Sequence, residues 1–227
     1  MRTGPREPVI TIDGPAGAGK STLARSLADR LGYRLLDTGA LYRGVAWAVR
    51  EAGLPVAESP ALRALLARTP IAIADDRVLV GGRDVTVEIR TPEISELTSA
   101  LSRLRAVREA LLPLQRAHAA AGGVVLEGRD TGSVVCPDAE IKLYLDASPR
   151  VRARRRQEEL RERGIEADLE TVRAEVERRD RQDMERELAP LRRPEGAVVV
   201  DASDLEPEQV LQACLDVVER ARCCTRS

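Results

Sequence analysis

Apolar runs and helical repeats alternate along the first fifty residues of the chain. Residues 9–13 form a short apolar run, which predicts a buried strand, and leucines recur at helical spacing over residues 21–31. A second strand candidate at 33–37 is followed by a helical pattern over about 40–52. Alternation of strands and helices is typical of a parallel sheet covered by helices on its faces. The pattern therefore predicts an α/β fold.

Residues 55–92 break this alternation. A short helical pattern near 61–68 precedes three strand candidates, which are separated by two pairs of turn-forming residues. Such pairs between short apolar runs are hairpin signals, so we predict a small antiparallel β insertion in the α/β core. The strand candidates are 71–74, 77–80 and 83–87, and the turn pairs are Asp75-Asp76 and Gly81-Gly82.

Alternating strands and helices resume after residue 92. Helical patterns span 93–121 with a break near Ser102, and an apolar strand candidate follows at 124–126. The last helix, over 206–222, carries one apolar stripe. Between them the pattern predicts a strand at 140–145, arginine-rich helices at 149–163 and 169–187 joined near Gly164, and a strand at 197–201.

Length and composition indicate one enzyme-sized unit. The chain has 227 residues, of which 43% are hydrophobic, and no stretch approaches the roughly 18 uninterrupted apolar residues that a membrane span needs. Its four cysteines form no Cys-x-x-Cys pair and His118 is the only histidine, which disfavours a zinc cluster. We expect a monomeric, cytoplasmic protein without a membrane partner.

The charge of the chain is balanced. A net charge of −1 lacks the strongly basic balance that attracts nucleic acid, so we expect no nucleic-acid partner, and a phosphate ligand must be held by local cations. The lysines are Lys20 and Lys142, and nearly all other basic residues are arginine. This scarcity makes the position of Lys20 informative.

Residues 14–21 match the phosphate-binding pattern Gly-x4-Gly-Lys-Ser, between a predicted strand and a predicted helix. Glycines let backbone N–H groups turn toward the β- and γ-phosphates of ATP, and the helix adds the positive end of its dipole. Lys20 is expected to neutralise charge on the transferring group, and the Ser21 hydroxyl to bind Mg²⁺. A flexible glycine turn is the simpler alternative. The residues predicted to bind ATP here are Gly14, Pro15, Ala16, Gly17, Ala18, Gly19, Lys20, Ser21 and Thr22.

Two further polar clusters follow predicted strands. One spans residues 37–43 and places Arg43 about one helical turn past the strand, and the other is Gly128-Arg129-Asp130. Ligands of parallel sheets gather at the carboxyl ends of the strands. An arginine beside an aspartate suits a site that clamps a phosphate and accepts a hydrogen bond from an amino group.

Over residues 9 to about 218 the chain resembles the bacterial-type cytidylate (CMP) kinases, a family of P-loop nucleoside-monophosphate kinases. The resemblance implies a P-loop kinase fold with a core of residues 1–54, 93–148 and 187–227, a nucleotide-binding insertion at 55–92, and a helical lid at 149–186. It implies transfer of the γ-phosphate of ATP, with Mg²⁺, to CMP and dCMP in pyrimidine nucleotide metabolism. The motifs that carry it are 12–22, 36–43, Arg108-Glu109-Ala110-Leu111, Gly128-Arg129-Asp130, Asp138-Ala139, Leu145-Asp146-Ala147 and Ala189-Pro190-Leu191.

The resemblance also assigns roles to single residues. It implies that Lys20, Arg129 and Arg186 are catalytic, and that the lid residues Arg152 and Arg156 contact ATP. A carboxylate can accept a hydrogen bond from cytosine N4, whereas uracil presents O4 there and leaves buried polar groups mismatched. The implied substrate contacts are Thr38, Arg43, Arg129 and Arg186 for the phosphate, Ser99, Arg108 and Asp130 for the base, and Arg179 and Asp183 for the ribose; Tyr42 is also an implied substrate-binding residue, with no part of the substrate assigned to it.

Several of these residues have simpler interpretations. Asp130 could pair with Arg129 to hold its loop, Ser99 could cap a helix, and Asp37 could orient Arg43 or end its strand. Glu127 stands where some relatives carry Asp, and it is assigned no Mg²⁺ contact.

The arginine-rich segment and the overall function also leave alternatives. Arginines and glutamates are interleaved over residues 150–193, which fits a solvated helical hairpin with i,i+4 ion pairs as well as a mobile lid hinged near Gly164. Another small-molecule P-loop kinase, acting on a different nucleotide, shikimate or gluconate, would share the phosphate loop. An ATP-gated RNA-associated protein is an alternative from another class.

Overall fold

The computed structural model describes residues 6–74, 77–162 and 164–224. The chain divides into two compact units: unit 1 comprises Met1–Leu35 and Ala119–Ser227, and unit 2 comprises Leu36–His118. The expected division into core, insertion and lid has other boundaries than these two units, and it stays a prediction. Among the described residues, no helix has the length and apolar character that crossing a membrane requires.

Unit 1 is built on a parallel sheet. The strand order is β2-β6-β1-β7-β8, and the pairs β1–β6, β1–β7 and β7–β8 are all parallel. At the start of β2 the Arg34 amide donates to Gly123 O, 3.0 Å away, just before β6. This confirms the predicted central parallel sheet. The strands are β1 (Val9–Asp13), β2 (Arg34–Asp37), β6 (Val124–Glu127), β7 (Ile141–Asp146) and β8 (Val198–Asp201).

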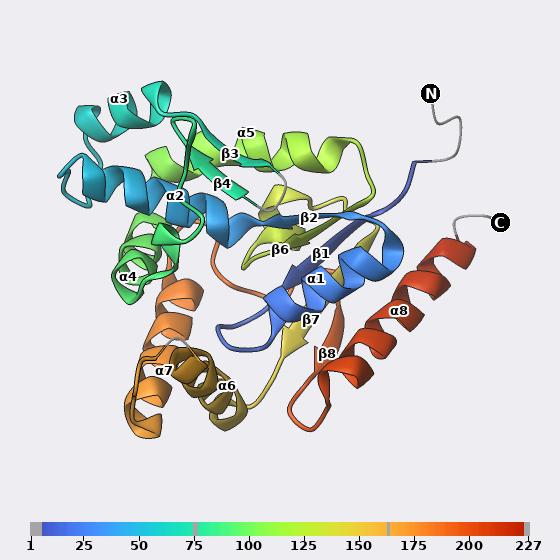
Figure 1. Ribbon diagram of the computed structural model, residues 1–227. Coiled ribbons are helices and arrows are strands. Elements are labelled where there is room, and N and C mark those ends of the chain that lie inside the picture. The colour runs from blue at the N-terminus through green and yellow to red at the C-terminus, as the bar shows by residue number, and fades with distance from the viewer. Residues whose placement is uncertain (1–5, 75–76, 163, 225–227) are drawn as a thin grey trace. The chain divides into compact units, whose positions relative to one another are not determined.

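One face of this sheet is covered by α1 (Lys20–Leu31) and α8 (Pro207–Cys224), which lie against each other in Figure 1. Side chains alternate along β1, so Ile10 and Ile12 point into this layer. Burial of each such aliphatic side chain stabilises the fold by about 1.5–3 kcal/mol. The predicted apolar stripe of the last helix is confirmed, because its members are all buried here: Val210, Leu211, Cys214, Leu215 and Val218.

The other face of β1 carries polar groups. Asp13 accepts hydrogen bonds from the amides of Thr131 and Gly132, both at 2.7 Å, and from the Thr131 hydroxyl at 2.8 Å. Thr131 opens η2 (Thr131–Val135), a π-helical turn that directly follows Arg129 and Asp130. Burial raises the pKa of Asp13, and the hydrogen bonds from Gly132 and Thr131 oppose that rise. A buried carboxylate at the end of β1 thus fixes the loop after β6.

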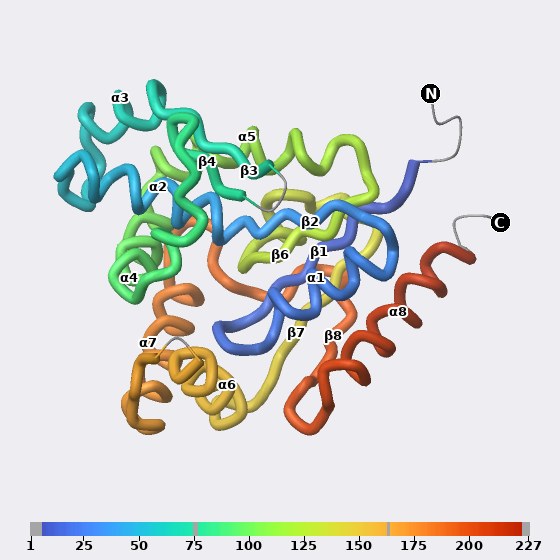
Figure 2. The backbone as a smooth tube through the Cα atoms, in the orientation of Figure 1, coloured from blue at the N-terminus to red at the C-terminus, as the bar shows by residue number. Residues whose placement is uncertain are grey.

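The arginine-rich segment folds as two helices, α6 (Pro149–Glu162) and α7 (Leu169–Glu185), which lie side by side in Figure 2. Their contact buries Leu160, Val172 and Val176. The Asp168 side chain caps α7 by accepting from the Thr171 amide at 3.0 Å. The predicted pair of helices joined near Gly164 is therefore confirmed, while Arg163 lies outside the described residues.

Unit 2 packs helices on a small antiparallel sheet of order β3-β4-β5. Gly44 lets the sheet approach α2 closely, because a Cβ there would lie 3.3 Å from side chains of both Ile71 and Val80. The helices of unit 2 are α2 (Thr38–Glu51), α3 (Pro60–Arg68), α4 (Pro92–Leu101) and α5 (Arg105–Ala120), and the strands are β3 (Ile71–Ala74), β4 (Arg77–Val80) and β5 (Arg83–Asp84).

The predicted antiparallel insertion is confirmed, and one of its strands is shorter than expected. The β3–β4 pair forms the first hairpin, although its turn pair Asp75-Asp76 lies outside the described residues. Gly81 and Gly82 turn the second with φ of 58° and 85°. The strand prediction over 83–87 is wrong beyond Asp84, because the Asp84 carboxylate accepts from the Thr86 amide and hydroxyl and turns the chain into a 3₁₀ helix at Glu88–Arg90.

Candidate active site

Residues 14–19 form the turn between the end of β1 and the start of α1, and Lys20 and Ser21 open the helix, as predicted. Two of the glycines are required by close backbone contacts. A Cβ on Gly14, whose φ is +149°, would lie 2.0 Å from Leu145 O, and one on Gly17, at φ +74°, would lie 2.7 Å from Arg152 O. Gly19 precedes α1 and has no side chain to cap it, so the first amides of the helix are left for an anion.

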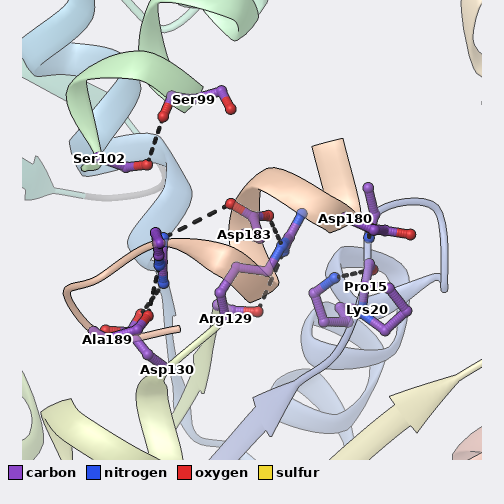
Figure 3. Close-up of polar contacts among 12 residues, drawn as sticks. Pro15, Lys20, Ser99, Ser102, Arg129, Asp130, Asp180, Asp183 and Ala189 are labelled. Atoms are coloured by element: carbon purple, nitrogen blue, oxygen red, sulfur yellow. Dashed lines mark hydrogen bonds and ion pairs between the residues drawn. The ribbon is translucent and has the colours of Figure 1, made fainter. Parts of the chain in front are cut away.

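Lys20 is buried, and its ammonium group donates to Pro15 O at 2.6 Å (Figure 3). Burial and then the positive charge of Arg129 lower the pKa of Lys20 from 10.5 to about 7, while the negative charge of Glu127 opposes the shift. A lysine with a pKa in this range is poised to gain a proton when a polyanion comes near.

Ser21 lies beside an acidic residue from another strand. Its hydroxyl oxygen is 2.9 and 3.0 Å from the two carboxylate oxygens of Glu127, a buried residue at the end of β6. A hydroxyl and a carboxylate are the hard oxygen ligands that Mg²⁺ prefers. The residues present therefore fit a magnesium ion, and they include Glu127, which the sequence left without a role.

The lid arginines predicted to contact ATP have different surroundings. Arg152 is 6% exposed and donates to Ala147 O at 2.9 Å, to Ala16 O at 3.0 Å and to the carboxylate of Asp180. Arg156 donates to Glu159 at 2.7 Å, and its buried Nε has no hydrogen-bond partner among the described residues. Arg156 thus keeps a donor for a ligand, whereas Arg152 is occupied by protein acceptors.

The predicted acceptor residues of unit 1 form one ion-pair network. The Asp183 carboxylate accepts from Arg129 Nε at 3.0 Å and lies 3.7 Å from Arg186 Nη1, and Arg186 Nη2 lies 3.5 Å from Asp130 (Figure 3). Arg186 is 5% exposed and also donates to Ala189 O at 2.6 Å. Asp183 thus holds two guanidinium groups, one from the loop after β6 and one from the end of α7.

Like charges crowd this network. Burial, and next the positive charges of Arg129 and Arg156, lower the pKa of Arg179. Burial also lowers the pKa of Arg129, but the charges of Asp183 and Glu127 outweigh it, so that the pKa of Arg129 is raised. After burial, the positive charge of Arg129 also lowers the pKa of Lys20, so Arg129 repels both the P-loop lysine and Arg179 in one cluster of cations. Such a cluster favours a bound polyanion.

In unit 2, Asp37 has two local partners. Its Oδ1 accepts from the Ala40 amide at 2.9 Å, which caps α2, and its Oδ2 lies 2.7 Å from Arg43 Nη2. Thr38 opens the helix and is 4% exposed. The Arg43 Nε is buried without a hydrogen-bond partner among the described residues. Both sequence interpretations of Asp37 therefore hold: it ends its strand and it orients Arg43.

The base-reading candidates of unit 2 also lie together. The Arg108 guanidinium stands 5.8 Å over the centre of the Tyr42 ring and donates to Ser102 O at 3.3 Å. The Ser102 hydroxyl in turn donates to Ser99 O at 2.9 Å (Figure 3). Ser99 lies in the last turn of α4, whose N-cap is Thr91. The C-cap of α4 is Ser102, so the interpretation of Ser99 as a helix cap is wrong.

Sequence reasoning missed the roles of Asp13, Glu127 and Asp180, whose partners are far away in the chain. For Asp180 a signal was present. Val172, Val176 and Asp180 follow at spacings of four, so they share one face of α7, and the two valines are buried. A carboxylate on an apolar helical stripe indicates a buried partner.

Comparison with known proteins identifies relatives along nearly the whole chain. The model of the cytidylate kinase family matches residues 10–220. A cytidylate kinase of Geobacter sulfurreducens is 50% identical over 224 residues, 96% of each chain, and one of Methylococcus capsulatus is 46% identical over 93% of this chain and 97% of its own. A solved shikimate kinase from Bacteroides thetaiotaomicron, 16% identical, covers 93% of this chain and 98% of its own with a TM-score of 0.51, which shows the P-loop kinase fold alone. The chain belongs to the cytidylate kinase family.

Proposed function

We propose that this protein transfers the γ-phosphate of ATP to CMP, giving CDP and ADP, and that it also accepts dCMP. The observation that carries the proposal is the position of Arg129, which Asp183 holds at 3.0 Å: together with burial, the larger cause, its positive charge lowers the pKa values of both Lys20 and Arg179. Such mutual repulsion is relieved by a polyphosphate. Relatives 46–50% identical over almost the entire chain are cytidylate kinases, which supports CMP as the acceptor.

The reaction needs positioning and charge stabilisation more than covalent chemistry. An oxygen of the CMP phosphate attacks the γ-phosphorus, and the bond from that phosphorus to the β–γ bridging oxygen breaks, releasing ADP. Lys20, Arg129 and Arg186 stabilise the charge on the transferring group. The P-loop amides and Arg156 hold ATP, and this role of Arg156 is supported by its Nε, which has no hydrogen-bond partner within the part of the chain that the structure describes.

Oxygen ligands for Mg²⁺ are present at the P-loop. The Ser21 hydroxyl and the Glu127 carboxylate, 2.9–3.0 Å apart, would hold the ion. When bound with ATP, Mg²⁺ neutralises charge on the β- and γ-phosphates.

Residues of both units are proposed to bind the acceptor. Arg43 is proposed to bind the CMP phosphate with Thr38, Arg129 and Arg186. Its buried Nε has no hydrogen-bond partner among the described residues, which supports this role. Asp130 accepts from cytosine N4, and Arg108 donates to the base edge. The stacking of Arg108 on Tyr42 supports this role, because it orients the guanidinium. Ser99 completes the base contacts, and Arg179 and Asp183 are proposed to bind the ribose.

A coupled ADP-release assay with CMP, dCMP, UMP, AMP and GMP tests the proposal. Turnover with CMP and dCMP well above the other monophosphates is the expected result. Shikimate and gluconate are included in the assay as test compounds, because a P-loop kinase for another small molecule is the alternative that the sequence left open. Absence of ADP release with any monophosphate, combined with salt-sensitive RNA binding, would refute the kinase. Light scattering during gel filtration tests the proposed monomer.

A further inference from the structure

Two charged residues of the lid helices are buried against the phosphate loop. Arg152 of α6 and Asp180 of α7 form an ion pair, and they are 6% and 5% exposed. Burial of an ion pair is unfavourable unless further hydrogen bonds satisfy both charges. The other hydrogen bonds of Arg152 and Asp180 therefore indicate which part of the structure this ion pair stabilises.

The pair holds both peptide groups of one P-loop residue. Asp180 Oδ1 accepts from the Ala16 amide at 3.0 Å, and Arg152 Nη1 donates to Ala16 O at 3.0 Å. The Ala16 side chain packs with Leu160, Val172 and Val176, the apolar contact between α6 and α7. The loop is thus anchored to both lid helices by polar and apolar contacts together.

The same contact reaches the catalytic lysine. The carbonyl and the N–H of a trans peptide point in opposite directions. In the peptide between Pro15 and Ala16, the N–H donates to Asp180, and the oxygen accepts from the Lys20 ammonium at 2.6 Å. Figure 3 shows Pro15, Lys20 and Asp180 together. Asp180 therefore orients the peptide plane on which Lys20 rests.

Helix α7 carries Asp180 and the acceptor-side residues on one rigid element. Asp183 follows Asp180 by about one helical turn and pairs with Arg129 at 3.0 Å. Arg179 directly precedes Asp180, and Arg186 ends the helix. One helix therefore contacts the P-loop at Ala16 through Asp180 and the acceptor-side residues Arg129 and Asp130 through Asp183 and Arg186.

We infer that Arg152 and Asp180 are positioning residues that couple occupancy of the P-loop by ATP to binding of the acceptor nucleotide through α7. The inference rests on the proposed function. Coupling between two sites is reciprocal, so ATP tightens the binding of CMP by the same factor by which CMP tightens the binding of ATP. Neither residue needs to touch a substrate for this role.

The test measures the dissociation constant of CMP by calorimetry, with and without a non-hydrolysable ATP analogue. In the parent protein the analogue is expected to tighten CMP binding by about fivefold or more. The coupling ratio is the dissociation constant of CMP without the analogue divided by that with it. In Asp180→Asn this ratio is expected to fall to about one, and the KM values for both substrates are expected to rise by a larger factor than kcat falls. Glu177→Gln is the matched control, because it removes a carboxylate from the same helix that pairs with exposed Arg173 and not with the P-loop.

A second variant keeps the test decisive where Asp180→Asn fails to fold. Arg152→Met with Asp180→Leu removes both charges together, so no unpaired charge is left buried. Its ratio is also expected to be about one, whereas Glu177→Gln keeps the parent ratio. A parent ratio of one, or a parent-like ratio in the folded Asp180 variant, overturns the inference. Failure of the parent to phosphorylate CMP refutes instead the proposed function.

Discussion

At Lys20, burial and neighbouring charge act on the residue that is proposed to stabilise the transferring phosphoryl group. Its pKa is lowered to about 7, so at pH 8 most of the free protein carries it neutral. The phosphates of ATP favour the ammonium, so binding is expected to raise this pKa. We predict that ATP binding takes up close to one proton at pH 8 and little at pH 6. Calorimetry in buffers of different ionisation enthalpy measures that uptake.

The variant Lys20→Met is the control that shows whether the proton taken up on ATP binding goes to Lys20. The variant is expected to show no uptake from this position and to lose transfer with every acceptor. In the parent, the apparent affinity for ATP should decrease as the pH rises through 7, since neutral Lys20 must first be protonated. Proton release at pH 8 would contradict the assignment.

Asp130 tests base recognition separately from ATP binding. It is 6% exposed and lies 3.5 Å from Arg186, so it stands next to a proposed phosphate ligand. Asp130→Ala removes the acceptor for cytosine N4 and is predicted to lower kcat/KM for CMP by about 100-fold. The KM for ATP should change little. Steady-state kinetics with each substrate varied in turn separates the two, and an unchanged kcat/KM for CMP would remove Asp130 from the base site.

The residues that the sequence could predict are those whose neighbours in the chain define them. Residues 14–21 are identified by spacing alone, because the turn, the lysine and the helix are contiguous. The roles of Glu127 and Asp180 depend on contacts with Ser21 and Ala16, more than a hundred residues away in the chain. The apolar stripe of α7 indicates that Asp180 has a buried partner, but no local pattern shows which residue that partner is, for Asp180 or for Glu127.

The start of helix α2 combines a contribution to stability with a proposed role in substrate binding. Asp37 caps the helix through the Ala40 amide and also holds Arg43 at 2.7 Å. Asp37→Ala is predicted to lower the free energy of unfolding by about 1 kcal/mol, because the cap is lost. It should also raise the KM for CMP, because Arg43 is no longer oriented. Denaturant unfolding and CMP kinetics measure the two effects.

Asp37→Ser separates these effects. Serine caps helices about as well as aspartate but carries no charge for Arg43. Stability close to that of the parent, with the KM for CMP still raised, is the expected outcome. If serine restores the KM as well, Asp37 acts on the substrate only through the helix.

Whole elements follow from the sequence where the apolar period is strong. The strand Val9–Asp13 and the hairpin strands Ile71–Ala74 and Arg77–Val80 are predicted with their observed bounds. The prediction fails where side-chain chemistry overrides the pattern. At Asp84 a carboxylate bonded to Thr86 ends the strand, and this local competition with the sheet is invisible to an apolar count.

In the whole molecule, the proposed acceptor residues belong to two compact units. Arg129, Asp130 and Arg186 belong to unit 1, whereas Arg43 and Arg108 belong to unit 2. The membership of this set is what the resemblance of the sequence to the cytidylate kinases implies. The sequence offered Asp37 as a partner of Arg43, which lies close to it in the chain, but it could not predict that Tyr42 would hold Arg108, since that contact requires the folded helices.

Hydrogen exchange on the full chain tests whether both units take part in acceptor binding. CMP alone is predicted to slow amide exchange around residues 38–43 and 99–108 of unit 2 and around 129–130 of unit 1, because a bound ligand suppresses local opening. A non-hydrolysable ATP analogue alone should protect residues 14–22 most. Protection by CMP confined to unit 1 would mean that Arg43 and Arg108 do not contact the acceptor, and the base would then have to be recognised by Asp130 and its neighbours alone.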